Sequence, residues 1–273
     1  MSAAGRAGAF AAGRRRAGRL PPMSASPVLI VPAAGAGSRL GASVPKLLVP
    51  VNGRAMIDHL LDLYAPWVGA VILVLNPSAE PAVRDHLRAR PERILFREQA
   101  RPTGMLDAVL VPEADVRTLS PSRVWVTWCD QIAVHPATVR ALADADAGAA
   151  DAPLILPVAR RRDPYVHLAR DEAGRIVAVL HRREGDPMPA VGETEIGLFS
   201  LSRRAYLEDL PIFAAGVQPG SGTRERNFLP FIPWVAARGG VVTFPCVEEM
   251  ESVGVNTADD LAQVAAYLAA RGE

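Results

Sequence analysis

Apolar residues recur in short runs that alternate with stretches of helical spacing. Runs typical of buried strands lie at residues 28–31, 70–75, 93–96, 123–128 and 241–245. Helical spacing joins Met56, Ile57, Leu60, Leu61 and Tyr64, and predicts further helices at 79–89, 103–110 and 134–143. Strands separated by helices in this rhythm predict a mostly parallel sheet with right-handed crossovers.

The middle of the chain changes character. Strand patterns follow one another at 153–159, 165–169, 175–180 and 195–201, and a turn is expected at 171–174. We expect these strands to extend the same mixed sheet, with the next helix at 223–237. The last helix should start at Thr257, which forms a capping-box pattern with Asp260. The overall expectation is an α/β protein, a Rossmann-like three-layer αβα arrangement around a mostly parallel mixed sheet.

Composition separates the two ends of the chain. Residues 1–26 are rich in Ala, Gly, Arg and Pro, so we expect a disordered tail ahead of a single domain at 27–273. The formal net charge of the chain is +1, and five arginines lie in that tail, so the remainder carries about −4. A domain with this charge gives no reason to expect nucleic-acid binding. No run reaches the ~20 apolar residues of a membrane span. The expected location is cytoplasmic.

The stretch from residue 28 to residue 50 carries the first chemical signal. A strand pattern runs into Ala33, Ala34, Gly35 and Gly37, and such a turn can gather backbone N–H groups around a phosphate. Ser38 and Arg39 follow, and then comes Lys46, the single lysine of a chain with 29 arginines. A compact ammonium on a thin stem can reach a crowded phosphate that a flat guanidinium cannot.

This motif is neither a Walker loop, since it lacks GK[ST], nor a Rossmann GxGxxG, since Leu40 stands where the third small residue belongs. The order strand, AAG-x-G-S-R-L and PK resembles the nucleotidylyltransferase superfamily of sugar-1-phosphate, MobA-like and IspD-like enzymes. The resemblance implies the nucleotide-diphospho-sugar transferase fold. It also implies nucleotide binding by the Gly-rich turn and catalytic roles for Arg39 and Lys46.

A metal site is expected at Asp130, which directly follows a strand pattern. Ligands of open α/β sheets bind at the carboxyl ends of strands, and one or two carboxylates with substrate phosphates are the usual Mg²⁺ ligands. The segment Gly254-Val255-Asn256 resembles the GVN tripeptide of N-acetylglucosamine-1-phosphate uridylyltransferases, the pyrophosphorylase domains that the chain resembles most. This resemblance implies that Asn256 shares Mg²⁺ with Asp130.

The nucleobase site is expected in the segment 97–104. It resembles the Q-x-x-x-x-G-T-G region of the same superfamily, which implies base contact by Gln99, Thr103 and Gly104. An amide side chain suits such a role because it both donates and accepts hydrogen bonds.

The acceptor side departs from the uridylyltransferases. His181 stands where their EHK-like stretch has a carboxylate, and Glu195, two residues before Gly197, stands where their NTGIY-like strand has Asn. Glu195 could accept hydrogen bonds from two hydroxyls of a polyol. Arg182 or Arg183 is a candidate for the acceptor phosphate, although the three arginines at 160–162 compete for this role. Gly197 is expected to bind the substrate together with Glu195, and Glu225 is a candidate for sugar hydroxyls. His181 is expected to be a packed or surface residue.

The sequence therefore predicts a Mg²⁺-dependent nucleotidylyltransferase. Its expected partners are an NTP and a phosphorylated small molecule, in first place a sugar or cyclitol 1-phosphate. Two alternatives stay open: a cytidylyltransferase acting on an alcohol or polyol phosphate, and a non-catalytic protein that senses nucleotide-sugars. The oligomeric state is also left open.

Overall fold

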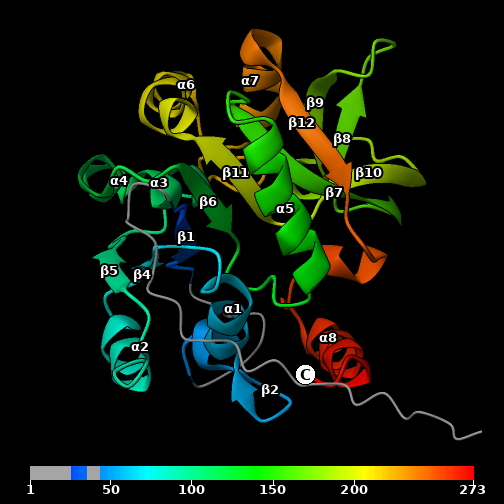
Figure 1. The fold of residues 1–273 in the computed structure, drawn as a ribbon. Coiled ribbons are helices and arrows are strands. Elements are labelled where there is room, and N and C mark those ends of the chain that lie inside the picture. The colour runs from blue at the N-terminus through cyan, green and yellow to red at the C-terminus, as the bar shows by residue number, and fades with distance from the viewer. Residues whose placement is uncertain (1–25, 36–43) are drawn as a thin grey trace, which may run out of the picture.

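A computed structural model describes residues 26–35 and 44–273 (Figure 1). Within these residues an eight-stranded sheet has the order β10-β7-β11-β6-β1-β4-β5, with β12 beside β7. The strands are β1 (Val28–Ala33), β4 (Ala70–Leu75), β5 (Ile94–Glu98), β6 (Arg123–Thr127), β7 (Leu154–Arg162), β10 (Val191–Glu195), β11 (Leu198–Ser202) and β12 (Val241–Pro245). β1, β4, β5 and β6 run parallel, whereas β11 is antiparallel to both β6 and β7.

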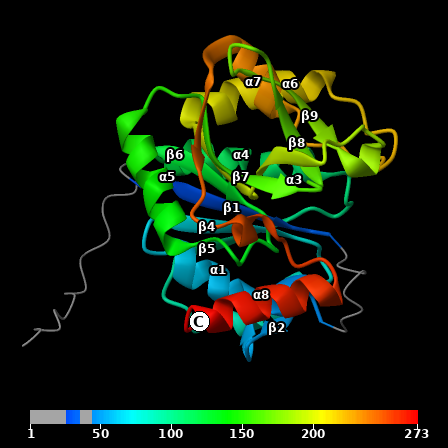
Figure 2. The same ribbon diagram turned by 90° about the vertical axis from the view of Figure 1, so that its right-hand side faces the viewer.

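Helices cover both faces of the sheet, because its central strands are apolar on both sides. Leu29 and Val31 of β1 face one core cluster, and Val28 and Ile30 face the other. The first cluster takes its helical residues from α1 (Met56–Tyr64), α2 (Glu80–His86), α5 (Pro136–Gly148) and α8 (Ala258–Ala270). The second takes them from α3 (Met105–Leu110), α4 (Glu113–Leu119), α6 (Leu210–Gly216) and α7 (Phe231–Gly239). The three-layer αβα prediction is confirmed (Figure 2).

One expected part of the mixed sheet is separate. β8 (Val166–Arg170) and β9 (Ile176–His181) form their own antiparallel hairpin, so the prediction that residues 165–180 join the main sheet is wrong. The predicted turn at 171–174 closes this hairpin, and Gly174 has the positive φ of +78° that the turn requires. Val166, Leu168 and Ile176 are buried in the same cluster as α7, which replaces main-sheet pairing as the packing surface.

Helix boundaries differ most after residue 200. The helix expected at 223–237 begins only at Phe231, because residues 220–230 form turns in which Asn227 Oδ1 accepts the Leu229 N–H at 3.0 Å. A π-helix at Ala205–Asp209 leads into α6, and neither element was expected. At the C-terminus Thr257 and Asp260 form the predicted capping box of α8.

The N-terminal boundary can be described from Ser26 onward. Ser26 is buried and its carbonyl accepts the Ser122 N–H at 3.2 Å, although the expected tail includes this residue. Residues 1–25 of that tail lie outside the described residues. No helix among residues 26–35 and 44–273 is long and apolar enough to cross a membrane.

Candidate active site

The single lysine of the chain forms hydrogen bonds with both metal-site candidates. Lys46 Nζ donates to Asp130 Oδ2 at 2.7 Å and to Asn256 Oδ1 at 3.1 Å. Lys46 begins the short 3₁₀ helix Lys46–Leu48, which is held by the buried side chain of Leu47. The Lys46 and Asp130 side chains are 13% and 15% exposed, so their ion pair is largely shielded from water.

Backbone contacts position the two candidate metal ligands. The Val255 N–H donates to the Asp130 carbonyl at 3.0 Å, which joins the loop after β6 to the segment before α8. The Asn256 N–H donates to Asp260 Oδ2 at 3.1 Å, so the capping box of α8 also positions Asn256. A Cβ on Gly254 would lie 3.1 Å from the Asp130 Cγ, and a side chain there would crowd the carboxylate.

The donor set suits magnesium. Asp130 and Asn256 direct two oxygens at one ammonium, so the protein already stabilises a positive charge at this position. No group of three or more His, Cys, Asp or Glu side chains in the described part of the chain could hold a metal ion. Mg²⁺ accepts such a small protein ligand set, since it keeps waters and takes substrate phosphates as its remaining ligands.

The expected nucleotide-binding residues partly converge. A cavity of about 90 Å³ lies at the end of β1 and is lined by Ala34, Gly35, Gln99, Gly104 and Glu225, among others. Gln99 is only 8% exposed, and its Nε2 donates to the Gly104 carbonyl at 3.2 Å. Within the described residues no group donates to its side-chain oxygen, which stays available as an acceptor.

Gly104 owes its place to a close backbone approach. Its φ is +131°, and a Cβ would overlap the backbone of Arg226. The Arg226 N–H donates to the Thr103 carbonyl at 2.9 Å, and the Leu106 N–H donates to the Arg226 carbonyl at 3.0 Å. These bonds place Glu225 in the wall of both this cavity and a larger one.

Two of the expected nucleotide contacts, Ala33 and Thr103, do not line this cavity. Ala33 ends β1 opposite Leu75 and packs against the core. The Thr103 residue is exposed, and only its Oγ1 approaches Gln99 Nε2, at 3.5 Å. Gly37, Ser38 and Arg39 lie outside the described residues.

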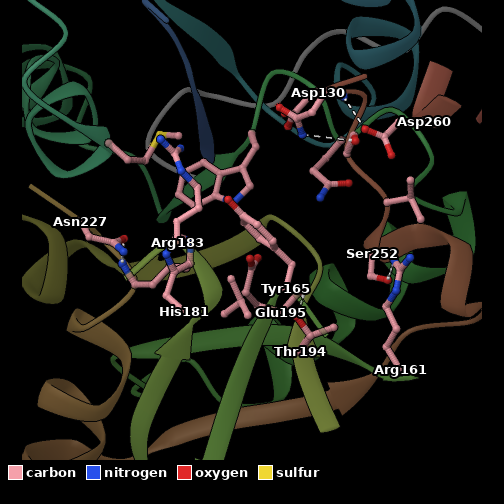
Figure 3. A pocket seen from close by; sticks show the side chains of 18 of the residues that line it. Asp130, Arg161, Tyr165, His181, Arg183, Thr194, Glu195, Asn227, Ser252 and Asp260 are labelled. Atoms are coloured by element: carbon pink, nitrogen blue, oxygen red, sulfur yellow. Dashed lines mark hydrogen bonds between the residues drawn. The ribbon is translucent and has the colours of Figure 1, made fainter. Parts of the chain in front are cut away.

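The larger cavity has a volume of about 460 Å³ and joins the metal-site candidates to the acceptor-site candidates (Figure 3). Asp130, Asn256, Arg183, Glu195 and Glu225 all line it. Gly197 lies behind this wall with a φ of +73°, where a Cβ would overlap Gln131 and Trp128. Its N–H donates to the Glu195 carboxylate, so Gly197 acts on the cavity through Glu195.

Three further side chains line the larger cavity: Tyr165, which was not expected there, His181, which was expected to be packed or on the surface, and Arg161, one of the three arginines that compete for the acceptor phosphate. Tyr165, His181 and Arg161 project from the hairpin β8–β9 and from β7 into the larger cavity (Figure 3). The His181 Nδ1 is buried with no hydrogen-bond partner among the described residues, and burial lowers the pKa of the imidazole. His181 is the last residue of β9, and Arg161 is the last residue but one of β7. Their positions at the ends of strands were the signal available in the sequence.

Burial of Glu195 gives a measurable pH effect on stability. Desolvation raises the pKa of this carboxyl from 4.5 to about 7, and the Asp130 charge adds to the increase. A raised acid pKa favours folding below the unfolded value and loses that contribution as pH rises through 7. We expect the free energy of unfolding of the wild type, relative to Glu195→Gln, to fall by on the order of 3 kcal/mol between pH 4 and pH 8.

Urea unfolding of both proteins at several pH values measures this difference. Glu193→Gln removes an acid from a half-exposed position on the same strand and serves as the matched control. Parallel pH curves for the wild type and Glu195→Gln would show that the carboxyl titrates as it does in the unfolded chain.

Comparison with known proteins places this arrangement in a class. Residues 29–193 match the MobA-like NTP transferase domain. The chain is 28% identical over 245 residues to the bifunctional protein GlmU of Heliobacterium modesticaldum, covering 88% of this chain and 51% of that protein. It is 26% identical over 249 residues to the GlmU of an Exiguobacterium species, covering 89% and 52%. The chain thus spans about half the length of these curated relatives.

A solved structure shares the fold. The crystal structure of a putative glucose-1-phosphate thymidylyltransferase from Bacillus anthracis, in complex with a sucrose, superposes with a TM-score of 0.66 at 17% identity, covering 89% of this chain and 94% of that one. The α/β sheet and its covering helices therefore form the nucleotide-diphospho-sugar transferase fold. The chain belongs to the MobA-like NTP transferase family.

Proposed function

We propose that the protein joins an NTP to a sugar or cyclitol 1-phosphate and releases pyrophosphate. The observation that carries this proposal is the contact of Lys46 with Asp130 and Asn256 at the edge of the larger cavity. A nucleotide site and an acceptor site are offered by two cavities that share Met105 and Glu225 as a wall. The similarity to GlmU proteins and to a thymidylyltransferase supports this choice of substrates.

The chemistry requires positioning and charge more than covalent work. An oxygen of the acceptor phosphate attacks the α-phosphorus, a new P–O bond forms, and the bond to the bridging oxygen of the β-phosphate breaks. Negative charge grows on the leaving pyrophosphate, where the Lys46 ammonium can neutralise it. The backbone at Ala34 and Gly35 can approach the nucleotide closely, because no atom of the described residues lies within 4 Å of the position that a Cβ on Gly35 would take.

Asp130 and Asn256 would hold Mg²⁺, which when bound supplies positive charge to the reacting phosphates. Asp130 Oδ2 and Asn256 Oδ1 now accept hydrogen bonds from the Lys46 ammonium, so Lys46 would leave these two oxygens if they held the metal. The long side chain of lysine permits this movement without a change in the backbone. Lys46 would then be available to the triphosphate.

A substrate panel tests the proposed function. Five nucleotides, ATP, CTP, GTP, UTP and dTTP, are each combined with Mg²⁺ and with sugar 1-phosphates, cyclitol phosphates or polyol phosphates. Pyrophosphate release and the mass of the conjugate are measured. We expect one nucleotide to be joined to a sugar or cyclitol phosphate, and release with polyol phosphates alone would favour the cytidylyltransferase alternative. Binding without release in every combination would contradict the proposal.

The metal dependence of that reaction tests the ligand assignment. We expect Asp130→Asn to raise the Mg²⁺ concentration for half-maximal rate at least about tenfold, because one anionic ligand is lost. Asp151→Asn, an exposed position, is the matched control and should leave the requirement unchanged. An unchanged requirement in Asp130→Asn would show that the metal binds elsewhere.

A further inference from the structure

The larger cavity contains a buried carboxyl group, Glu195, to which the proposed reaction assigns no role. Glu195 is 8% exposed and ends β10, where it points into the cavity (Figure 3). The Gly197 N–H donates a hydrogen bond to it. A carboxylate can accept about four hydrogen bonds, so acceptor capacity remains for a ligand.

Among the described residues no cation forms an ion pair with Glu195, and the charged group that acts on it is the acidic Asp130. Asp130 in turn has the Lys46 ammonium as its partner. The imidazole of His181 supplies little charge at neutral pH, because burial lowers its pKa.

The two other cations of the cavity wall suit an anion. Arg161 donates to Ser252 Oγ at 3.0 Å, and Arg183 lies in the short 3₁₀ helix after β9. Both line the cavity without an ion pair to an acid among the described residues. Either one can therefore bind the phosphate of the acceptor, which leaves Glu195 to the remainder of the same molecule.

We propose that the acceptor carries a protonated amine that binds Glu195, so that it is an amino-sugar or aminocyclitol phosphate. This inference rests on the proposed function and specifies its acceptor. Burial disfavours the ionised form of Glu195, and an ammonium stabilises that form because it supplies a countercharge and donates hydrogen bonds. A neutral hydroxyl or an acetamido group donates hydrogen bonds without supplying the charge.

The test compares hexose 1-phosphates that differ in one substituent. Glucose 1-phosphate is compared with its 2-, 3-, 4- and 6-amino analogues and with their N-acetyl forms, using the nucleotide found by the panel. We expect one amino analogue to exceed both neutral partners in kcat/KM by about 10- to 100-fold, the range for a hydrogen bond to a charged group. Preference for a hydroxyl or an acetamido group would overturn the inference.

Glu195→Gln then tests the assignment to this side chain. The amide keeps the shape and removes the charge, so the preference for the amine should fall to about twofold or less. Glu193→Gln is the matched control on the same strand and should keep the wild-type preference, since its carboxylate pairs with Arg170 outside the cavity wall. An unchanged preference in a folded Glu195→Gln would assign the amine to another group.

The outcomes separate the two proposals. Release of pyrophosphate with neutral acceptors only would overturn the amine inference and keep the proposed function. Absence of release with every acceptor would overturn both. Because the wild-type comparison alone measures the preference, the inference remains testable if Glu195→Gln does not fold.

Discussion

Replacing Lys46 with methionine is expected to lower turnover by about 10²–10³, because one preorganised charge opposite the reacting phosphates is removed. The loss should appear mainly in kcat, since the charge on the leaving pyrophosphate grows during the reaction. Pyrophosphate release with saturating nucleotide and acceptor measures it. Turnover within a few-fold of the wild type would remove Lys46 from the mechanism.

Two further variants interpret that loss. Lys46→Arg keeps the charge but replaces a compact ammonium with a planar fork, so we expect it to recover only part of the rate. Arg54→Ala removes an exposed cation from the neighbouring strand β3 (Arg54–Ala55), where it pairs with Asp62, and should leave the rate unchanged. Full activity in Lys46→Arg would show that charge alone is sufficient.

The single lysine also permits a direct measurement of its movement. Reductive methylation with ¹³C-formaldehyde labels Lys46 and the N-terminal amine and no other side chain. Asp130→Asn alters the Lys46 environment without metal, because the ammonium then loses its charged partner. We expect Mg²⁺ with nucleotide to shift the Lys46 signal in the wild type, and an unmoved signal would show that the ion pair persists in the complex.

The sequence predicted the site best where local pattern and sheet topology agree. Asp130 follows a buried strand, and the carboxyl edge of a parallel sheet is where such a residue meets a ligand. Lys46 and Asn256 are 210 residues apart, and their contact could be expected only from a family resemblance that covers both ends of the chain. The local spacing of residues does not predict a contact between side chains that are so far apart in the sequence.

The failures arise where tertiary contacts override the pattern. Phe228, Leu229, Phe231, Ile232 and Val235 have helical spacing, but the first two lie in a turn that packs against the same core as α7. Burial therefore explains their apolar character without helix formation. The positions of His181 and Tyr165 depend on the docking of a hairpin that forms a separate sheet, and strand patterns do not specify docking.

A second large effect is expected at the other end of β6, where a buried polar network joins three elements. Arg123 Nε donates to Ser200 Oγ at 2.7 Å and lies 2.8 Å from Asp146 Oδ1. Asp146 Oδ2 accepts the Trp125 indole N–H at 2.6 Å. Because the Arg123 and Asp146 side chains are only 5% and 10% exposed, removal of either partner leaves a buried charge uncompensated.

We expect Asp146→Ala to lower the free energy of unfolding by about 3–5 kcal/mol. Urea unfolding followed by tryptophan fluorescence measures this change. Asp144→Ala, at an exposed position of the same helix, is the matched control and should change stability by less than about 0.5 kcal/mol. The double variant Arg123→Met, Asp146→Leu should recover most of the loss, because it removes both charges together.

The location of the network separates stability from catalysis. Arg123 begins β6, and Asp130 follows its opposite end, so the network lies outside the cavity wall. The part of the Asp146→Ala population that stays folded should therefore keep the wild-type kcat and the wild-type Mg²⁺ requirement. A lowered kcat in fully folded protein would instead show that the network sets the position of Asp130 through the strand.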